Sequence, residues 1–423
     1  MKTKKIDLKY AKLYLIKTNK FRSITIKVLL KDKLKKEDIT RRNFLIDYLT
    51  LTSNKYKTRQ ALALKIQELY SLYINGYDTR LGNYLITKFS MSLLNPKYTE
   101  ANMLEESIDL LKEIIFNPHV KNNKFDSKCF EVVKNGILNE IKTIKENPKT
   151  YANIKMLENM DPNATYAYHG YGYIEDLEQI NEKNLYEYYQ NLLKTADVDI
   201  YVIGDFNQEE MIKIIKDKLN FQTLKKPKED IYTYHDKVLS KPKIIIEKEN
   251  NNQSKLSIGC KLKDLTEFER KYVINLYNMI LGGGFNSKFM QIIREKNSLA
   301  YYINSSVLKA DNILLIQSGI SKENFKKVVS NIKKIMKNIT KGDITEEELE
   351  TVRTEYLSLL EEVNDNIDSI LENYIATNLL NLDDFSVRKE KIKEVTVQDI
   401  INVSKKVHMD TIYLLEDGGN NNA

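Results

Sequence analysis

Hydrophobic and polar residues follow two different periods along this chain. They alternate in RSITIKVLLK, which starts at Arg22, and in SKLSIGCKLK, which starts at Ser254, as in the strands of a half-buried sheet. Apolar residues recur every three or four positions from Thr99 to Ile115 and from Ser321 to Lys337, which predicts amphipathic helices. This mixture predicts an α+β fold in which helices pack on a largely antiparallel sheet.

The chain also contains an internal duplication. INEKNLYEYYQNLLKTADVDIYVIGDF, from Ile180, and VTVQDIINVSKKVHMDTIYLLEDG, from Val395, both consist of a short amphipathic helix, a polar turn and an apolar strand. They align at an offset of 412 − 200 = 212 residues. KFDSKCFEVVKNGILNEI aligns with DITEEELETVRTEYLSLL at 344 − 125 = 219, and the two alternating strands align at 254 − 22 = 232. Repetition on this scale predicts two homologous domains.

The join between the copies lies in a charged segment that lacks helical periodicity and contains Pro227 and Pro242. We therefore predict an N-terminal domain at residues 1–222, a linker at residues 223–242 and a C-terminal domain at residues 243–423. A length of 423 residues suits two cores better than one.

Composition excludes several other classes of protein. Two cysteines, Cys129 and Cys260, are too few for a disulfide scaffold, and no apolar run is long enough to span a membrane. The net charge of 66 − 59 = +7 is spread over helices in which Lys and Glu alternate, so we expect no nucleic-acid partner. Because no signal peptide is recognisable either, a cytoplasmic location is the default expectation.

Three segments carry a resemblance to a known family. LGGGFNSKFMQIIREKNSLAYYINS, from Leu281, resembles the second domain of the insulinase/pitrilysin-type zinc metallopeptidases, the inverzincins. FDSKCFEVVKNGILNEIKTIKENP resembles the helix that bears their third zinc ligand, and IYVIGDF resembles the strand that closes their first domain. The resemblance keeps its order over nearly the whole chain, and it implies the insulinase-like fold in both predicted domains.

The zinc motif of the family is missing. Active members carry H-x-x-E-H on a helix, because histidines four positions apart share a helix face and the Glu activates the zinc-bound water. The equivalent helix here is RRNFLIDYLTL, which places Asn43 and Asp47 at the histidine positions and Ile46 at the general-base position. Only Glu140, at the position of the third ligand, is retained. The resemblance thus implies a chain that is not an enzyme by itself, and we expect neither a metal nor another cofactor.

One pair of residues at the family's substrate site is retained. Arg294 and Tyr301 stand seven apart in REKNSLAY, and the resemblance implies that they contact a bound peptide and its developing oxyanion. In two-subunit members, one chain supplies the zinc and the other supplies this pair. The alternative for Arg294 is a helix C-terminus favoured by the dipole, and the alternative for Tyr301 is an ordinary aromatic residue of a hairpin.

The resemblance therefore implies a non-catalytic subunit that completes the substrate site of an active, insulinase-like paralogue with an intact H-x-x-E-H. Its substrate would be a peptide or protein. SLAYYINSS and GDITEEELE are most similar to a bacterial branch, the inactive partner associated with 5-aminopentanol modification of elongation factor P. Two alternatives remain: a structural assembly subunit without a role in proteolysis, and a weak stand-alone peptidase.

Overall fold

The computed structural model describes residues 2–100, 102–222 and 230–418. The chain divides into two compact units, each with its own sheet and hydrophobic core. The first unit comprises residues 1–142, 169–230 and 366–375, and the second comprises residues 143–168, 231–365 and 376–423. Of the residues that the structure describes, none belongs to a helix that is long and apolar enough to cross a membrane.

The first unit is built on a six-stranded sheet in the order β1-β2-β8-β3-β5-β4. Every neighbouring pair is antiparallel except β2 and β8, which are parallel. Its strands are β1 (Lys2–Asp7), β2 (Lys12–Lys17), β3 (Ser23–Lys33), β4 (Tyr73–Leu81), β5 (Tyr84–Leu94) and β8 (Asp197–Gly204). The prediction of a largely antiparallel sheet is confirmed.

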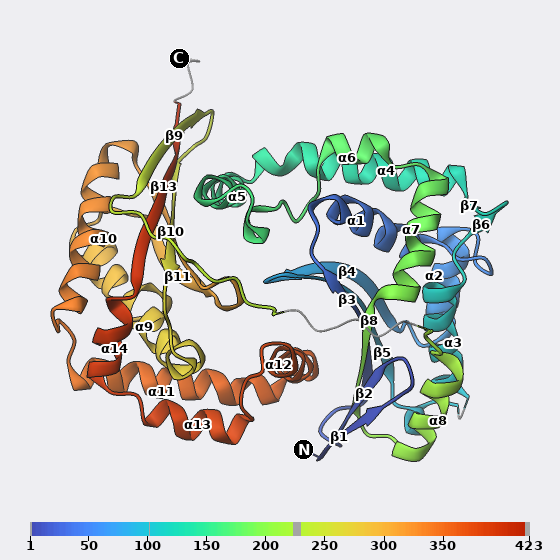
Figure 1. Cartoon of the computed structure of the whole chain (residues 1–423). Coiled ribbons are helices and arrows are strands. Elements are labelled where there is room, and N and C mark those ends of the chain that lie inside the picture. The colour runs from blue at the N-terminus through green and yellow to red at the C-terminus, as the bar shows by residue number, and fades with distance from the viewer. Residues whose placement is uncertain (1, 101, 223–229, 419–423) are drawn as a thin grey trace. The chain divides into compact units, whose positions relative to one another are not determined.

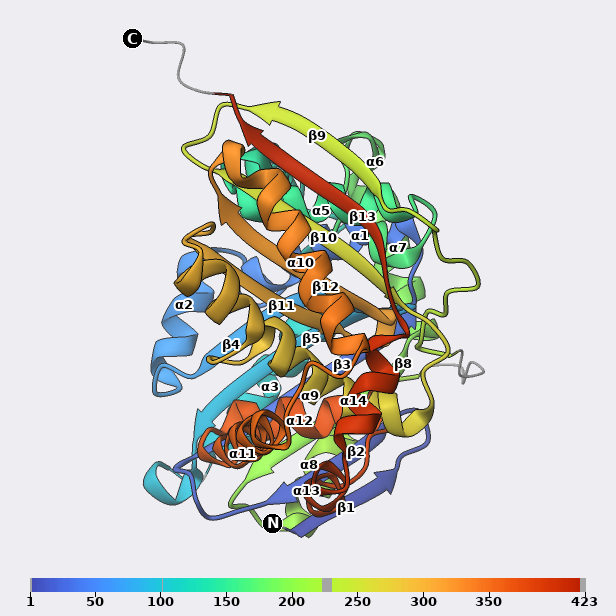
Figure 2. The same cartoon turned by 90° about the vertical axis from the view of Figure 1, so that its left-hand side faces the viewer.

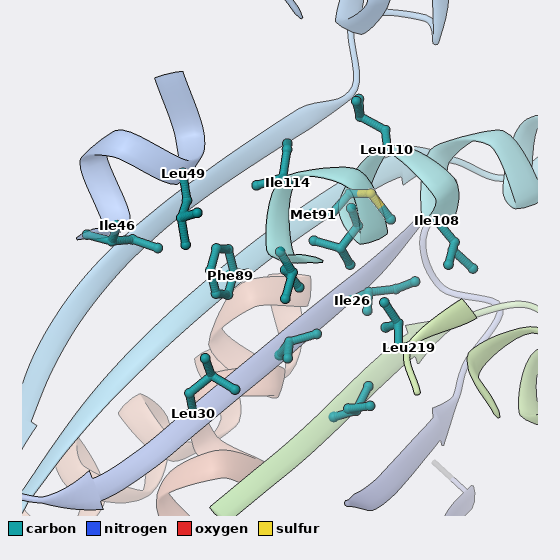
Figure 3. Close-up of a cluster of buried hydrophobic side chains, with 14 of the residues drawn as sticks. Ile26, Leu30, Ile46, Leu49, Phe89, Met91, Ile108, Leu110, Ile114 and Leu219 are labelled. Atoms are coloured by element: carbon teal, nitrogen blue, oxygen red, sulfur yellow. The ribbon is translucent and has the colours of Figure 1, made fainter. Parts of the chain in front are cut away.

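Helices cover the first sheet and bury its apolar side chains (Figure 1). They are α1 (Lys36–Leu51), α2 (Arg59–Glu68), α3 (Met103–Phe116), α4 (Ser127–Lys142), α6 (Ile174–Gln179), α7 (Glu182–Thr195) and α8 (Gln208–Lys218). Figure 3 shows side chains of α1 and α3 meeting those of β3 and β5 in this core. The predicted helix at Thr99 begins only at Met103, after a short 3₁₀ turn at Pro96–Tyr98.

The second unit holds a five-stranded sheet in the order β11-β12-β10-β13-β9. Its strands are β9 (Lys243–Glu249), β10 (Ser254–Leu262), β11 (Tyr302–Leu308), β12 (Ile313–Ile320) and β13 (Val407–Asp417). Its helices are α5 (Pro148–Met160), α9 (Ile274–Asn278), α10 (Phe325–Thr340), α11 (Glu346–Glu362), α13 (Phe385–Lys393) and α14 (Val397–Ser404). The apolar face of α10 packs across this sheet (Figure 2).

Topology confirms the duplication. The run β2-β8-β3-β5-β4 in the first sheet has the same order and the same strand directions as β9-β13-β10-β12-β11 in the second. Each copy therefore contains one parallel pair, at β2–β8 and at β9–β13. The helices before the matching strands β8 and β13 both begin with a capping box, at Asn181 in α7 and at Thr396 in α14.

The compact units differ from the predicted domains in two segments. Helix α5, from the first copy, belongs to the second unit, and the first nine residues of α12 (Ile367–Leu379), from the second copy, belong to the first unit. The predicted linker, residues 223–242, lies partly outside the described residues. Its described part, residues 230–242, contains neither helix nor strand. Each half of the sequence therefore contributes one helix to the unit that contains the other half's sheet.

Candidate functional site

Helix α1 carries the residues at the zinc-motif positions. Ile46 is only 3% exposed and belongs to the core of the first unit, where it lies close to Leu49 of the same helix in Figure 3. Strand β4 runs close to this point, and a Cβ atom on its Gly76 would lie 2.5 Å from Ile46 Cδ1. The position that the resemblance assigns to the general base is therefore filled by a packed hydrocarbon that can neither ligate a metal nor accept a proton.

Asn43 is engaged by the tyrosine-rich loop that precedes α6. Its Nδ2 donates a hydrogen bond of 2.8 Å to the carbonyl oxygen of Gly170. Two residues later, Gly172 adopts a φ of +86°, and a Cβ atom there would lie 2.7 Å from Thr40 Oγ1. The loop is fixed to α1 a second time by the backbone N–H of Tyr173, which donates to Thr40 Oγ1 at 3.0 Å. The contact of this loop with Asn43 joins residues 170 − 43 = 127 positions apart and had no signal in the sequence.

Asp47 and Glu140 lie near each other, on α1 and α4. Partial burial, the negative charge of Glu140 and that of Asp78 together raise the pKa of Asp47 to about 6. Both residues keep contact with solvent. The structure therefore brings the predicted positions Asn43, Ile46, Asp47 and Glu140 into one region of the first unit.

Sequence reasoning missed a buried polar network beside this region. Arg42 is fully buried, and it donates to the hydroxyl of Tyr188 at 2.8 Å and to Thr87 Oγ1 at 2.9 Å. The Thr87 hydroxyl in turn donates to Asp78, and Asp32 lies 3.6 Å from the guanidinium. Burial raises the pKa of Asp78 to about 6 despite the opposing effect of Arg42. An arginine next to the motif in an ordinary helix gave no signal that it would be buried.

The donor set at the zinc-motif positions does not fit zinc. It offers an amide whose N–H is already bonded, a packed isoleucine and two carboxylates, whereas Zn²⁺ prefers imidazole and thiolate. Among the described residues, only His119, Asp126 and Cys129 form a group of at least three possible ligands with donor atoms within 4.8 Å of one another.

Arg294 and Tyr301 belong to the second unit, and both side chains are accessible. Arg294 lies in the π-helical segment Met290–Lys296, is 46% exposed and has Glu295 at 3.9 Å. Tyr301 immediately precedes β11, its backbone N–H donates to the carbonyl of Gly319 at 2.9 Å, and the residue is 64% exposed. Neither side chain fills the core.

The Gly282-Gly283-Gly284 run precedes this segment and permits close packing. A Cβ atom on Gly282 would lie 2.6 Å from a ring carbon of Phe289 and 2.8 Å from Ser305 Oγ. None of the three glycines has a positive φ. Gly282 therefore allows the close approach of the helix to β11, and a left-handed turn is not involved at any of the three.

The fold of the two units is the one that the resemblance to zinc metallopeptidases implies. Residues 179–356 match the family described as "Peptidase M16 inactive domain". "Probable inactive metalloprotease YmfF" of Bacillus subtilis (strain 168) is 27% identical over 410 residues, which cover 95% of each chain.

Two solved structures extend the comparison. A conserved protein from Enterococcus faecalis V583 superposes with a TM-score of 0.91 over the whole of both chains at 26% identity. The structure of a peptidase M16 inactive domain from Pseudomonas fluorescens superposes with a TM-score of 0.79 at 17% identity, covering 99% of each chain. Residues 179–356 thus match the M16 inactive-domain family, and the resemblance to insulinase-type metallopeptidases predicted from the sequence is confirmed.

Proposed function

We propose that this chain is a non-catalytic M16-like subunit that pairs with an active paralogue and completes its substrate site. One contrast carries the proposal: Ile46 at the general-base position is buried, whereas Arg294 and Tyr301 are exposed. A chain that worked as a peptidase by itself would need a polar residue, able to accept a proton, at the general-base position. A chain with no role in proteolysis would have no need of an exposed cation and phenol at the spacing of the family.

The chemistry of the retained pair suits peptide binding. The guanidinium of Arg294 offers a planar fork of N–H donors, and the phenol of Tyr301 offers an O–H donor. Both can donate to a peptide carbonyl and to the oxyanion that develops when water attacks it. The partner would supply the metal, its ligands and the general base. The substrate of such a pair is a peptide or protein.

A narrower assignment follows from the branch that the sequence resembles. We propose that the pair acts in the cytoplasm, in the 5-aminopentanol modification of elongation factor P. SLAYYINSS and GDITEEELE support this branch. Deletion of the gene and measurement of the mass of elongation factor P would test it, because an unchanged modification state would contradict this narrower role without touching the pairing.

The absence of activity in the isolated chain is tested directly. The purified protein is expected to cleave no peptide in a chelator-sensitive manner, because losing a positioned general base alone costs about 10²–10⁴-fold. Zinc-dependent turnover that disappears on Asp47→Ala would instead support the stand-alone peptidase.

The role of the pair is tested in the mixed complex with an H-x-x-E-H paralogue. Arg294→Ala should lower the kcat of the complex by about 10²–10³-fold, the usual cost of one oxyanion donor. Tyr301→Phe should cost less, because a neutral hydrogen bond contributes about 0.5–1.5 kcal/mol. Lys296→Ala, in the same π-helical segment, is the matched control.

Pairing and melting temperature are measured alongside activity. Normal pairing with full activity in both variants would favour the structural assembly subunit. A chain that stays monomeric at micromolar concentrations of the paralogue would contradict the whole proposal.

A further inference from the structure

A short hairpin and the start of α4 bring together three residues of different ligand chemistry. Strands β6 (Val120–Lys121) and β7 (Lys124–Phe125) are joined by two asparagines with positive φ. His119 precedes the hairpin and Asp126 follows it, and the backbone N–H of Asp126 donates to the carbonyl of His119 at 3.1 Å. Cys129 follows one helical turn later, so its side chain returns to the same place.

The three side chains are spaced almost as ligands of one metal ion. An imidazole nitrogen, a carboxylate oxygen and the thiol sulfur lie within 4.8 Å of one another, and Cys129 Sγ is 3.9 Å from His119 Nδ1. Bond lengths of about 2.0–2.3 Å place the ligand atoms of a tetrahedral zinc ion about 3.4–3.7 Å apart. Small side-chain rotations would therefore close the set around an ion.

The surrounding structure holds these residues in place. The fully buried Tyr48 donates its hydroxyl to the His119 carbonyl at 2.6 Å and accepts the N–H of Asp126 at 2.8 Å. Its ring packs against Phe125 with centroids 4.3 Å apart. Thr52 Oγ1 lies 3.7 Å from Cys129 Sγ. Groups that orient ligands in this way commonly determine how tightly a metal is held.

The carboxylate of Asp126 can serve the helix and an ion together. Its Oδ1 accepts the backbone N–H groups of Lys128 and Cys129, at 3.1 and 3.0 Å, as an N-cap does. The carboxylate also interacts with the thiol of Cys129 and with the imidazole of His119, and an ion bound among the three groups would replace these interactions. All three residues are half-buried, so an ion can reach them and a water molecule can occupy a fourth position.

We propose that His119, Asp126 and Cys129 form a binding site for a divalent transition-metal ion, with zinc as the best fit. A nitrogen, oxygen and sulfur set with one water is the pattern of three-ligand zinc sites. The proposal goes beyond the proposed function, because it uses none of the zinc-motif positions and does not depend on a partner. It departs from the sequence-based expectation of no metal, which considered the four histidines only as isolated residues.

Cobalt titration of the full-length protein tests the site. Co²⁺ bound by a thiolate gives a sulfur-to-metal charge-transfer band, so the chelator-treated protein should develop this band with one Co²⁺ per chain, and Zn²⁺ should displace it. Cys129→Ala should abolish the band, and Asp126→Asn should weaken binding by at least tenfold while keeping an N-cap residue. Cys260→Ala and His408→Gln, in the second unit, should leave the band and the affinity for Co²⁺ unchanged.

The outcomes are distinguishable from misfolding and from loss of the proposed function. Circular dichroism of Asp126→Asn establishes that the fold is intact, and no partner or activity is involved in the measurement. A band that survives Cys129→Ala and disappears on Cys260→Ala would overturn the proposal. Zn²⁺ binding no tighter in the wild type than in a His119→Gln, Cys129→Ala double variant would overturn it as well.

Discussion

The two sheets share a topology, yet each holds the helix received from the other half of the sequence by different chemistry. In the first unit, Glu372 of α12 accepts hydrogen bonds of 2.8 Å from Lys27 of β3 and from Lys88 of β5. In the second unit, Met156 and Met160 of α5 lie against Gly259 of β10, where a Cβ atom would clash with both sulfurs. The first contact is ionic and the second is apolar and close.

The two contacts differ because corresponding positions of β3 and β10 hold different residues. With the offset that aligns β3 and β10, Lys27 corresponds to Gly259, since 259 − 27 = 232. A lysine that is only 5% exposed requires a carboxylate, because a buried charge without a partner is costly. A glycine at the same position instead removes a side chain and admits a helix. Duplication therefore preserved the strand order, while the contact with the exchanged helix diverged.

Loss of the ionic contact should have the largest effect. Glu372→Ala leaves Lys27 and Lys88 without their shared carboxylate, and Asp368 can compensate only at Lys27. We expect the free energy of unfolding of the first unit to fall by about 2–3 kcal/mol, below the ~3–5 kcal/mol of a fully buried pair because Glu372 is partly exposed. Hydrogen exchange should rise in β3 and β5 and stay unchanged in β10. Asp368→Ala, a more exposed neighbour on α12, is the control with a small expected effect.

The same contact predicts a pH dependence with a definite sign. Although burial opposes it, hydrogen bonding and attraction from Lys27 and Lys88 hold the pKa of Glu372 below its usual value. A lowered pKa in the folded state means that this stabilisation is complete above the unfolded pKa, near 4.5, and is lost as the pH falls through the folded pKa. The stability difference between the wild type and Glu372→Gln should therefore shrink in acid. A difference independent of pH would show that the contact is not ionic.

Overpacking at Gly259 should have the next largest effect. Gly259→Val places methyl groups against Met156 and Met160, and forcing extra atoms into a packed site typically costs about 1–3 kcal/mol. Thermal unfolding should show the loss of stability, and hydrogen exchange should show that it is confined to the second unit. Met160→Ala in the same chain should recover part of the loss, because it frees the space that the valine needs. A Gly259→Val protein as stable as the wild type would mean that the helix does not depend on this close approach.

Strand and helix identities could be predicted from the sequence because the pattern is local. The matched segments around α7–β8 and α14–β13 have the expected form, since each alternates or repeats within its own element. The exchange of α5 and α12 could not be predicted, because it depends on contacts between residues far apart in the chain, from 259 − 160 = 99 to 372 − 27 = 345 positions. Lys27 in an alternating strand reads as a solvent-facing lysine until the carboxylate of Glu372 is placed beside it.

The features of the candidate site can also be divided into those that the sequence indicates and those that only the structure shows. The resemblance to the zinc metallopeptidases implied the degenerate positions on α1, and the structure adds that Ile46 is packed in the core. The engagement of Asn43 by Gly170 and the burial of Arg42 are long-range contacts that carry no local signal. The cluster of His119, Asp126 and Cys129 lies within eleven residues, yet a hairpin with two left-handed asparagines must form before they meet.

The smallest expected effect concerns the hydrogen bond by which α5 contacts the sheet of the second unit. The hydroxyl of Tyr151, on α5, donates to Glu247 of β9 at 2.8 Å, and the hydroxyl of Tyr413 donates to the same carboxylate. Tyr151→Phe keeps the ring and leaves Glu247 bonded to Tyr413, so the second unit should lose only about 0.5–1.5 kcal/mol, the net value of one hydrogen bond. Denaturant unfolding of this variant beside Glu372→Ala measures both exchanged helices on one scale. Because no buried charge is left without a partner, the tyrosine variant should remain clearly the more stable of the two. A loss as large as that of Glu372→Ala would show that both exchanged helices depend on polar contacts, and the contrast between the two sheets would then fail.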